Sequence, residues 1–412
     1  MLLAHKIRLF PTAEQETYFH KATGTARFAY NWGLAQVKKA LDTKNKAPGW
    51  LTLKKQLNAI KRTEFPWMYE VTKCSPEAAL SDLGTALANF WAGKRKGRKV
   101  GFPHFKKKGQ AKDKFYVSND QFALLGNVIR LPHIGAVAMS EPLRFTGKIM
   151  GAAVSRTAHH WFVSIQVEVE HTSVAHKSHV RAGGDLGLKT PITLSTGKTM
   201  DAPTPLKQSL KALARANRRL HRRQKGSKNR RKAAQEVARR HERIANIRKD
   251  WLHKATTLLA RRCSLIAIED LNVAGMLRSR RLARAVSDIG FGELRRQLAY
   301  KVPARGGLLV VVDRFYPSSR TCRKCKRVKD MPLSERIYVC DCGHVECRDL
   351  NAAKNLLCEA TRTVGRTGTK ACGPFTSTPK RRRFGASGRN EAGSPDSDTG
   401  HSNNSINLYP VC

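Results

Sequence analysis

The stretch SLIAIEDLNVAGM, residues 264–276, contains an apolar run that stops on two adjacent carboxylates, Glu269 and Asp270. A short apolar run of this kind is typical of a strand buried on both faces, as in a parallel sheet. The chain has 77 Lys and Arg residues against 31 Asp and Glu residues, a formal net charge of +46, so acidic residues are scarce. Because α/β sheets bind ligands at the carboxyl ends of their strands, this pair is a candidate part of a functional site.

The composition is that of a folded and strongly basic protein. The chain has 412 residues, 41% of them hydrophobic, which is enough for two or three domains with ordinary cores. The charge predicts a polyanionic partner, and nucleic acid is favoured over a membrane surface because no long apolar span is present. The start MLLAHKIRLFPT lacks a signal-peptide core, so we expect a cytoplasmic protein.

The first part of the chain predicts helices followed by a β region. Thr12, with Gln15 completing a capping box, is the expected start of a helix, and helical patterning continues to about residue 92. The basic run GKRKGRKVGFPHFKKKG, residues 93–109, favours contact with phosphates over a merely solvated loop. Alternation such as WFVSIQVEVE, residues 161–170, predicts a small β-barrel or curled sheet. HTSVAHKSHV, residues 171–180, is an expected linker.

The second part predicts an α/β domain. Residues 181–200 have the pattern of a β-hairpin, and residues 206–260 that of two amphipathic helices broken at KGSKN. Buried strands are expected at SLIAIE and GLLVVVD, with a helix between them. The basic helical pair fits a charge-laced hairpin and a lid facing nucleic acid equally well. After Thr361 the composition predicts disorder.

Three carboxylates stand at the expected ends of these elements: Asp185 in AGGDLG, Glu269, and Asp349 in CRDLNAAKNLL. Taken singly, Asp185 fits a turn residue, Asp349 a helix N-cap, and Asp270 a cap for the helix that follows it. Taken together, they predict a pocket of carboxylates that cannot all stay ionised without cations. A pair of Mg²⁺ or Mn²⁺ ions would satisfy them, activate water and stabilise the leaving oxygen of a phosphodiester.

Four of the ten cysteines have the spacing of metal ligands. Cys322 and Cys325 form a CxxC motif, and Cys340 and Cys342 form a CxC motif before a glycine. Four thiolates at this spacing predict a structural Zn²⁺ site, with His344 and Cys347 as alternative ligands. A zinc ribbon, the small fold that such a site holds together, is here rich in Lys and Arg. It either contacts nucleic acid or serves only to stabilise the fold.

The motifs also resemble a known family. GGDLGLKTPITLSTG, IAIEDLNVAGM, DRFYPSSRTCRKC and CDCGHVECRDLNAAKNLL resemble, in sequence and order, the TnpB (OrfB) family of transposon-encoded RNA-guided nucleases, relatives of type V CRISPR effectors. The segments IRLFPTAEQ, GTARFAYNWGL and GFPHFKKKG look like the amino-terminal half of that family. The resemblance extends from residue 1 to about residue 360.

The resemblance implies an α/β plus β fold. A RuvC-like nuclease domain of the RNase H fold with a zinc-ribbon insert is expected, preceded by a β-barrel wedge domain that carries a helical recognition insertion. The expected boundaries are 1–180 for the wedge domain, with its insertion at about 12–112; 181–318 and 348–360 for the nuclease domain, with a basic hairpin at about 204–260; 319–347 for the zinc insert; and 361–412 for a disordered tail.

It also implies a function. Asp185, Glu269 and Asp349 would be the catalytic acids and the ligands of Mg²⁺ or Mn²⁺, and the family pattern, not the periodicity, chooses Glu269 over Asp270. Members bind a guide RNA from the transposon end and cleave both strands of matching double-stranded DNA beside a short motif. We therefore expect a monomer with one RNA, in the bacterial or archaeal cytoplasm at the nucleoid and away from membranes. Cys347 departs from the family, many of whose members have an acid there.

Two other functions fit the same residues. One is a non-catalytic nucleic-acid-binding regulator, in which the acids are structural. The other is an unguided nuclease or a strand-transfer transposase, which would act on DNA without RNA.

Overall fold

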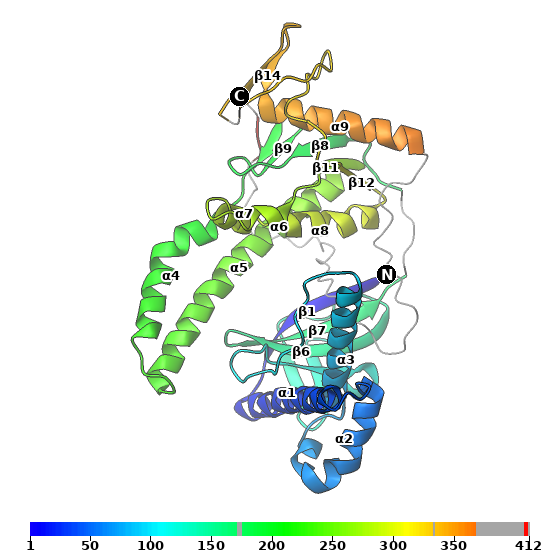
Figure 1. Cartoon of the computed structure of the whole chain (residues 1–412), viewed down its shortest axis with the longest axis vertical. Coiled ribbons are helices and arrows are strands. Elements are labelled where there is room, and N and C mark those ends of the chain that lie inside the picture. Colours follow the sequence, from blue (N-terminus) through cyan, green and yellow to red (C-terminus); the bar gives the residue numbers. More distant parts are fainter. Residues whose placement is uncertain (171–174, 333, 368–407, 411–412) are drawn as a thin grey trace. The chain divides into compact units, whose positions relative to one another are not determined.

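The computed structural model describes residues 1–170, 175–332, 334–367 and 408–410 and divides the chain into two compact units (Figure 1). Of the described residues, 1–170 form the first unit and the others form the second. Residues 171–174 of the expected linker lie outside the described residues. No helix in the described ranges is long and apolar enough to cross a membrane.

The first unit is built on a seven-stranded antiparallel sheet in the order β2-β6-β7-β1-β5-β4-β3. The predicted alternation is present in β7, where Val163, Ile165 and Val167 are fully buried. The ladders between the described residues leave β2 and β3 as edges, so the hydrogen-bonded sheet is open where the predicted barrel would close. The strands are β1 (Leu2–Phe10), β2 (Lys114–Ser118), β3 (Ala123–Leu125), β4 (Val128–Leu131), β5 (Gly135–Met139), β6 (Lys148–Thr157) and β7 (His160–Glu168).

Helices fill the interval between β1 and β2. The predicted capping box is confirmed, since the amide of Gln15 donates to Thr12 Oγ1 at 3.3 Å and the amide of Thr12 donates to Gln15 Oε1 at 3.1 Å. The expected continuous helical patterning is divided into α1 (Ala13–Asp42), α2 (Trp50–Glu64), a 3₁₀ turn η1 (Pro66–Glu70) and α3 (Cys74–Arg95), with a further 3₁₀ turn η2 (Asn119–Gln121) after β2. These helices share a core of their own, separate from that of the sheet.

The second unit contains a mixed sheet in the order β12-β11-β8-β9-β10-β15. β8, β11 and β12 are parallel, as the apolar runs predict for β11 and β12, and β8 pairs antiparallel with β9 in the predicted hairpin. The strands are β8 (Arg181–Asp185), β9 (Ile192–Leu194), β10 (Lys198–Met200), β11 (Leu265–Glu269), β12 (Leu308–Val312) and β15 (Leu408–Pro410).

Helices cover both faces of this sheet. Leu265 and Ala267 of β11 pack with residues of α9 (Arg348–Thr367), whereas Ile266 and Ile268 belong to the core formed with α5 and α8. The remaining helices are α4 (Pro205–His221), α5 (Lys228–Arg262), α6 (Val273–Met276), α7 (Ala283–Ile289), α8 (Phe291–Lys301) and the 3₁₀ turn η3 (Pro303–Arg305). The sheet is therefore the middle layer of a three-layer α/β unit.

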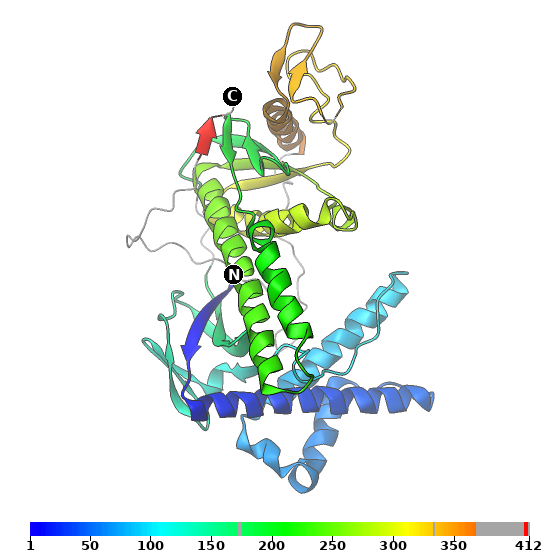
Figure 2. The same cartoon turned by 90° about the vertical axis from the view of Figure 1, so that its left-hand side faces the viewer.

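The predicted pair of basic helices is confirmed as α4 and α5, which lie side by side in Figure 2. Leu213 of α4 is buried, and so are Ala233 and Ile244 of α5, which gives the hairpin an apolar seam. Arg219 of α4 also pairs with Glu236 of α5 at 3.2 Å. The arginines that remain outside the seam are considered below.

The prediction that the chain is disordered after Thr361 is wrong for two segments. Helix α9 continues to Thr367, past residue 361, because Ala360 and Val364 still pack in the core that it shares with β11 and β12. Residues 408–410 form β15, which pairs antiparallel with β10. The rest of the tail, residues 368–407 and 411–412, lies outside the described residues.

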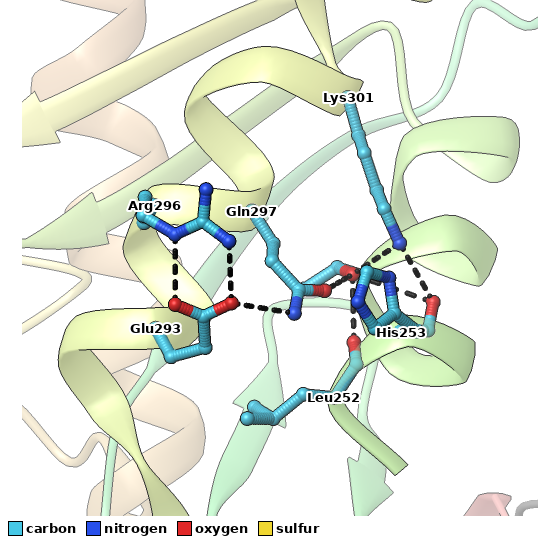
Figure 3. Close-up of polar contacts among 7 residues, drawn as sticks. Leu252, His253, Glu293, Arg296, Gln297 and Lys301 are labelled. Atoms are coloured by element: carbon cyan, nitrogen blue, oxygen red, sulfur yellow. Dashed lines mark hydrogen bonds and ion pairs between the residues drawn. The ribbon is translucent and has the colours of Figure 1, made fainter. Parts of the chain in front are cut away.

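A polar network joins α5 to α8 inside the second unit (Figure 3). Thr256 and Gln297 are fully buried, and the hydroxyl of Thr256 lies 2.8 Å from Gln297 Oε1. Lys301 Nζ donates to Thr257 Oγ1 at 2.7 Å and to the carbonyl of His253 at 2.9 Å. Because buried polar groups cost free energy when they lack partners, this network fixes how the two helices dock.

Acid is expected to destabilise the second unit through His253. Burial, and next the charge of Lys301, lower the pKa of His253 from 6.5 to about 4; Lys249 and Arg296 act in the same direction and Glu293 opposes them. The unfolded chain therefore binds the proton more readily, so this contribution to stability is present above pH 6.5 and is lost as the pH falls toward 4. One proton contributes at most about 1.4 kcal/mol per pH unit, and the partial exposure of His253 is expected to reduce this to about 1 kcal/mol.

Urea unfolding at pH 7 and pH 5 measures this effect. The free energy of unfolding of the His253→Gln variant should fall less over that interval than that of the wild-type protein. Equal falls would show that His253 does not titrate in this way.

Candidate active site and zinc module

Asp185 and Glu269 lie at the same edge of the parallel strands. Ile268 of β11 is paired with Gly184 of β8, so Glu269 and Asp185 occupy the next positions along neighbouring strands. Every second residue of a strand points to the same face of the sheet. Glu269 therefore points to the same face as Leu265 and Ala267, which pack against α9. Asp185 likewise points to the same face as Gly183, which contacts α9. Both carboxylates thus lie on the α9 face of the sheet.

Close packing of α9 brings the third carboxylate to this face. A Cβ atom on Gly183 would lie 1.9 Å from the carbonyl oxygen of Ala353, so only glycine allows the helix to sit there. Ala352 and Ala353 are fully buried, as their small size predicts. Asp349 lies in the first turn of α9, and its charge acts directly on Asp185. The structure therefore brings together the three acids that the sequence singles out.

Replacing Gly183 with Ala is expected to displace α9 and reduce the stability of the second unit. The added methyl group would overlap the backbone of Ala353, and overpacking of this kind typically costs about 1–3 kcal/mol. Gly184→Ala is the matched control, because a Cβ atom there has its nearest neighbour at 3.7 Å. Thermal unfolding of both variants tests this. Equal melting temperatures would contradict the close approach of α9.

The electrostatics of the triad favour a bound cation. Burial, followed by the charges of Glu269 and Asp349, raises the pKa of Asp185 well above its usual value, and Arg348 only partly opposes this. Burial also raises the pKa of Glu269 to about 7, although its carboxylate accepts a hydrogen bond from the backbone N–H of Leu186. Carboxylates held together in this way ionise fully when a cation neutralises them.

Two arginines border the triad. The guanidinium of Arg348 is buried and donates to the carbonyls of Pro332 at 2.7 Å and Glu335 at 3.3 Å. Arg336 lies 4.0 Å from Asp349 and is half exposed. The segment that carries Pro332, Glu335 and Arg336 thus packs beside the first turn of α9.

The four predicted cysteines form one cluster. The ligand atoms of Cys322, Cys325, Cys340 and Cys342 all lie within 4.8 Å of one another, with Sγ separations of 3.6 Å for Cys322–Cys342 and for Cys325–Cys340. Burial raises the pKa of the Cys322 thiol, but hydrogen bonds from the backbone of Cys325 and Lys324 outweigh it and lower that pKa to about 6. Four clustered sulfur donors fit a structural Zn²⁺ ion.

The alternative ligands are not in this cluster. His344 instead lies 3.7 Å from Glu346, and Cys347 belongs to the short hairpin of β13 (Ile337–Val339) and β14 (Val345–Cys347). We call the segment 319–347, which carries the four cysteines, the zinc module. Its core consists of Cys322, Cys340, Met331 and Tyr338, with Cys342 packed against it. Because this core is so small, metal binding is expected to supply much of the module's stability.

The sequence analysis missed two amides that tie the zinc module to α9. Asn351 Nδ2 and Asn355 Nδ2 donate to the carbonyl of Thr321 at 2.9 and 2.7 Å, and both asparagines are fully buried. Asn351 Oδ1 also accepts from the amide of Arg323 at 3.1 Å. The signal in the sequence is a pair of asparagines four residues apart on the face of a helix that also carries Ala352.

Two helix caps that the sequence allows are not formed. Asn272, not Asp270, caps α6, since its side chain accepts from the amide of Gly275 at 3.0 Å. Asp270 is paired with Arg295 and Arg314 instead. Asp349 is the second residue of α9 and lies within the helix rather than before it.

Comparison with known proteins assigns the family. Three family models match the chain: "Probable transposase" (OrfB_IS605) at residues 164–280, "Cas12f1-like, TNB domain" at 291–356 and "Helix-turn-helix domain" (OrfB_IS605) at 1–46. A Streptomyces pristinaespiralis protein named "Putative RNA-guided DNA endonuclease" is 35% identical over 360 residues, which cover 86% of this chain and 88% of that protein. The chain belongs to the TnpB (OrfB) family.

Other family members and a solved structure agree. The Escherichia coli K12 protein InsQ, which carries the same descriptive name, is 32% identical over 86% of this chain and 92% of its own length. A Cas12f1 chain, from a cryo-EM complex with sgRNA and target DNA, aligns over 87% of this chain and 98% of its own length, with a TM-score of 0.54 and 13% identity. This similarity shows that the fold is that of a Cas12f1-like protein.

Proposed function

We propose that the chain is an RNA-guided DNA endonuclease encoded by a transposable element. It would cut double-stranded DNA that matches its guide, beside a short motif, by hydrolysis at Asp185, Glu269 and Asp349. The single observation that carries the proposal is the convergence of these three acids on one face of an α/β sheet in a chain of net charge +46. The names of the two relatives described above support the same activity.

The triad is suited to hard divalent cations. Its donors are carboxylate oxygens, the ligands that Mg²⁺ and Mn²⁺ prefer, and the raised pKa values of Asp185 and Glu269 mark a place where positive charge is needed. Such ions, when bound, would activate water and stabilise the leaving oxygen of the phosphodiester. The chain itself would supply the ligands, and Arg336 is close enough to Asp349 to add positive charge at the rim.

The nucleic acid would be held in part by a basic surface of the second unit. One open hollow, at the end of α4 and the two residues after it, is lined by Arg215, Arg218, Arg219, Arg222 and Arg223. Side chains gathered in this way favour contact with a phosphate backbone over a purely solvated helical hairpin. The proposed partners are therefore a guide RNA from the transposon end and a target DNA duplex, with base pairing choosing the sequence.

The domain roles follow the same proposal. The sheet and helices of residues 1–180 would form the wedge and its helical recognition insertion, and residues 181–318 with 348–360 would form the RuvC-like nuclease of RNase H fold. Residues 319–347 would be a zinc ribbon that contacts nucleic acid. We further propose that the protein acts as a monomer with one RNA at the nucleoid of a bacterial or archaeal cell.

The RNA that co-purifies with the protein tests this proposal. The chain is expressed with its native flanking DNA, and the bound RNA is sequenced. A single discrete RNA that ends in sequence from beyond the transposon boundary is expected. A mixture of unrelated cellular RNAs would favour a non-catalytic nucleic-acid binder or an unguided enzyme.

A further inference from the structure

Asp270, the residue after Glu269, binds two arginines from different elements. Arg295 of α8 donates to Asp270 Oδ1, and Arg314, which follows β12, donates to Oδ2 through Nε at 3.1 Å and also through Nη2. The backbone N–H of Asp270 donates to the carbonyl of Val312 at 3.0 Å. We call Asp270, Arg295 and Arg314 the arginine clamp. It joins the carboxyl ends of β11 and β12 to α8.

The arginine clamp lies behind the triad. Neighbouring residues of a strand point to opposite faces, so Asp270 points toward α8 while Glu269 points toward α9 and Asp185. Asp270 is therefore not a fourth carboxylate of the metal-binding face. Its charge is already matched by two arginines, which lower the pKa of its carboxyl group, Arg314 most strongly.

Stability alone does not explain this arrangement. The side chains of Arg295 and Arg314 are 41% and 43% exposed, and that of Asp270 is 23% exposed. Ion pairs as accessible as these contribute little to the free energy of folding. A carboxylate bound on both oxygens by arginine side chains is nevertheless geometrically restricted, and here the restriction acts one residue from Glu269.

The chain just beyond β11 is also held by its backbone bonds and by Leu271, which packs against the core of the second unit. Leu271 turns back at once, with its amide donating to the carbonyl of Glu269 at 3.2 Å, and α6 begins at Val273. Without the side chain of Asp270, the end of β11 would keep the bond from Asp270 N–H to Val312 and the packing of Leu271, but it would lose its side-chain contact with α8. A small rotation there would turn the Glu269 carboxylate away from Asp185.

We propose that Asp270, through Arg295 and Arg314, is a positioning residue that sets the orientation of Glu269 in the carboxylate triad. This inference rests on the proposed nuclease function and adds to it three residues outside the carboxylate triad. Residues that orient metal ligands in this way typically change metal affinity or activity about 10- to 100-fold when they are replaced.

The test combines metal binding with cleavage. Asp270→Asn, which keeps the shape of the side chain, is expected to weaken Mn²⁺ binding to the RNA-loaded protein by about 10- to 100-fold, as measured by the EPR signal of free Mn²⁺. Cleavage of guide-matched DNA should fall in parallel, while binding of that DNA stays unchanged. Arg314→Met should reproduce both losses, and Arg314→Lys, a milder change, should retain part of the function.

A double variant and a control make the result specific. Asp270→Asn combined with Arg314→Met should lose no more than the larger single loss, because both changes break the same interaction. Glu359→Gln removes another carboxylate bound twice by one arginine, Arg362, at 2.7 and 3.0 Å within α9, and should leave Mn²⁺ binding unchanged.

Any one of three results would overturn the inference. Asp270→Asn could keep the Mn²⁺ affinity of the wild-type protein, the losses in the double variant could be additive, or Glu359→Gln could lose as much affinity as Asp270→Asn. Failure of the proposed function is a different result. In that case the wild-type protein with its RNA would not cut matching DNA, while the Mn²⁺ titrations would still decide whether the arginine clamp positions Glu269.

Discussion

Replacing Asp185 with Asn is expected to abolish DNA cleavage and leave guide-dependent DNA binding intact. Asp185 is the acid most strongly affected by its neighbours, since burial, Glu269 and Asp349 all raise its pKa. The substitution removes a charged ligand of the proposed metal site. Replacing a residue that only orients a metal ligand reduces activity by up to about 100-fold, so loss of the ligand itself should reduce cleavage by at least that much. A gel-based cleavage assay and a binding assay on the same DNA duplex measure the two effects.

The same substitution should not harm the fold. A neutral side chain relieves the repulsion among the three carboxylates, so the metal-free variant should unfold at the same temperature as the wild-type protein or at a higher one. Inactivity caused by misfolding would instead lower the melting temperature. Full cleavage by a well-folded Asp185→Asn variant would mean that Asp185 is not a catalytic acid, which would contradict the proposed site.

Removing zinc is expected to have the second largest effect. Cys322→Ser breaks the cluster of four thiols whose ligand atoms all lie within 4.8 Å of one another, and the small core of the module cannot replace the bound ion. The effect should reach the active site, because Asn351 and Asn355 bind the carbonyl of Thr321, the residue before Cys322. The first turn of α9, which carries Asp349, would lose those anchors.

Zinc content, proteolysis and cleavage together test this prediction. The wild-type protein should contain one zinc ion per chain, and Cys322→Ser should lose it, become sensitive to protease within residues 319–347 and cut DNA poorly. Cys358→Ser is the matched control, since Cys358 lies on α9 outside the cluster. A Cys322→Ser variant that lacks zinc but cleaves normally would show that the module does not support Asp349.

The local features of the fold were predictable because short-range physics determines them. The capping box at Thr12, the hairpin after β8 and the buried strand of LIAIE all follow from spacing and apolar pattern alone. The sequence also accounts for the close approach of α9, since glycines beside Asp185 and alanines after Asp349 leave room for two backbones.

Features that depend on partners distant in the chain were not predictable in this way. Asp270 resembled a helix cap, because its two arginines lie 25 and 44 residues further along the chain. The choice of Glu269 over Asp270 needed either the family pattern or the knowledge of which face α9 covers. The length of α9 was likewise hidden, since its last turns are polar except for residues that pack on the sheet.

Cleavage of a guide-matched duplex tests the central claim most directly. The purified protein with its co-purified RNA is incubated with Mg²⁺ and a linear duplex that carries the guide-matched segment beside a randomised flank, and the ends are sequenced. The account predicts cuts in both strands that require the RNA, Mg²⁺, the match and a particular short flanking motif. Cutting that persists after the RNA is removed, or that ignores the match, would contradict it.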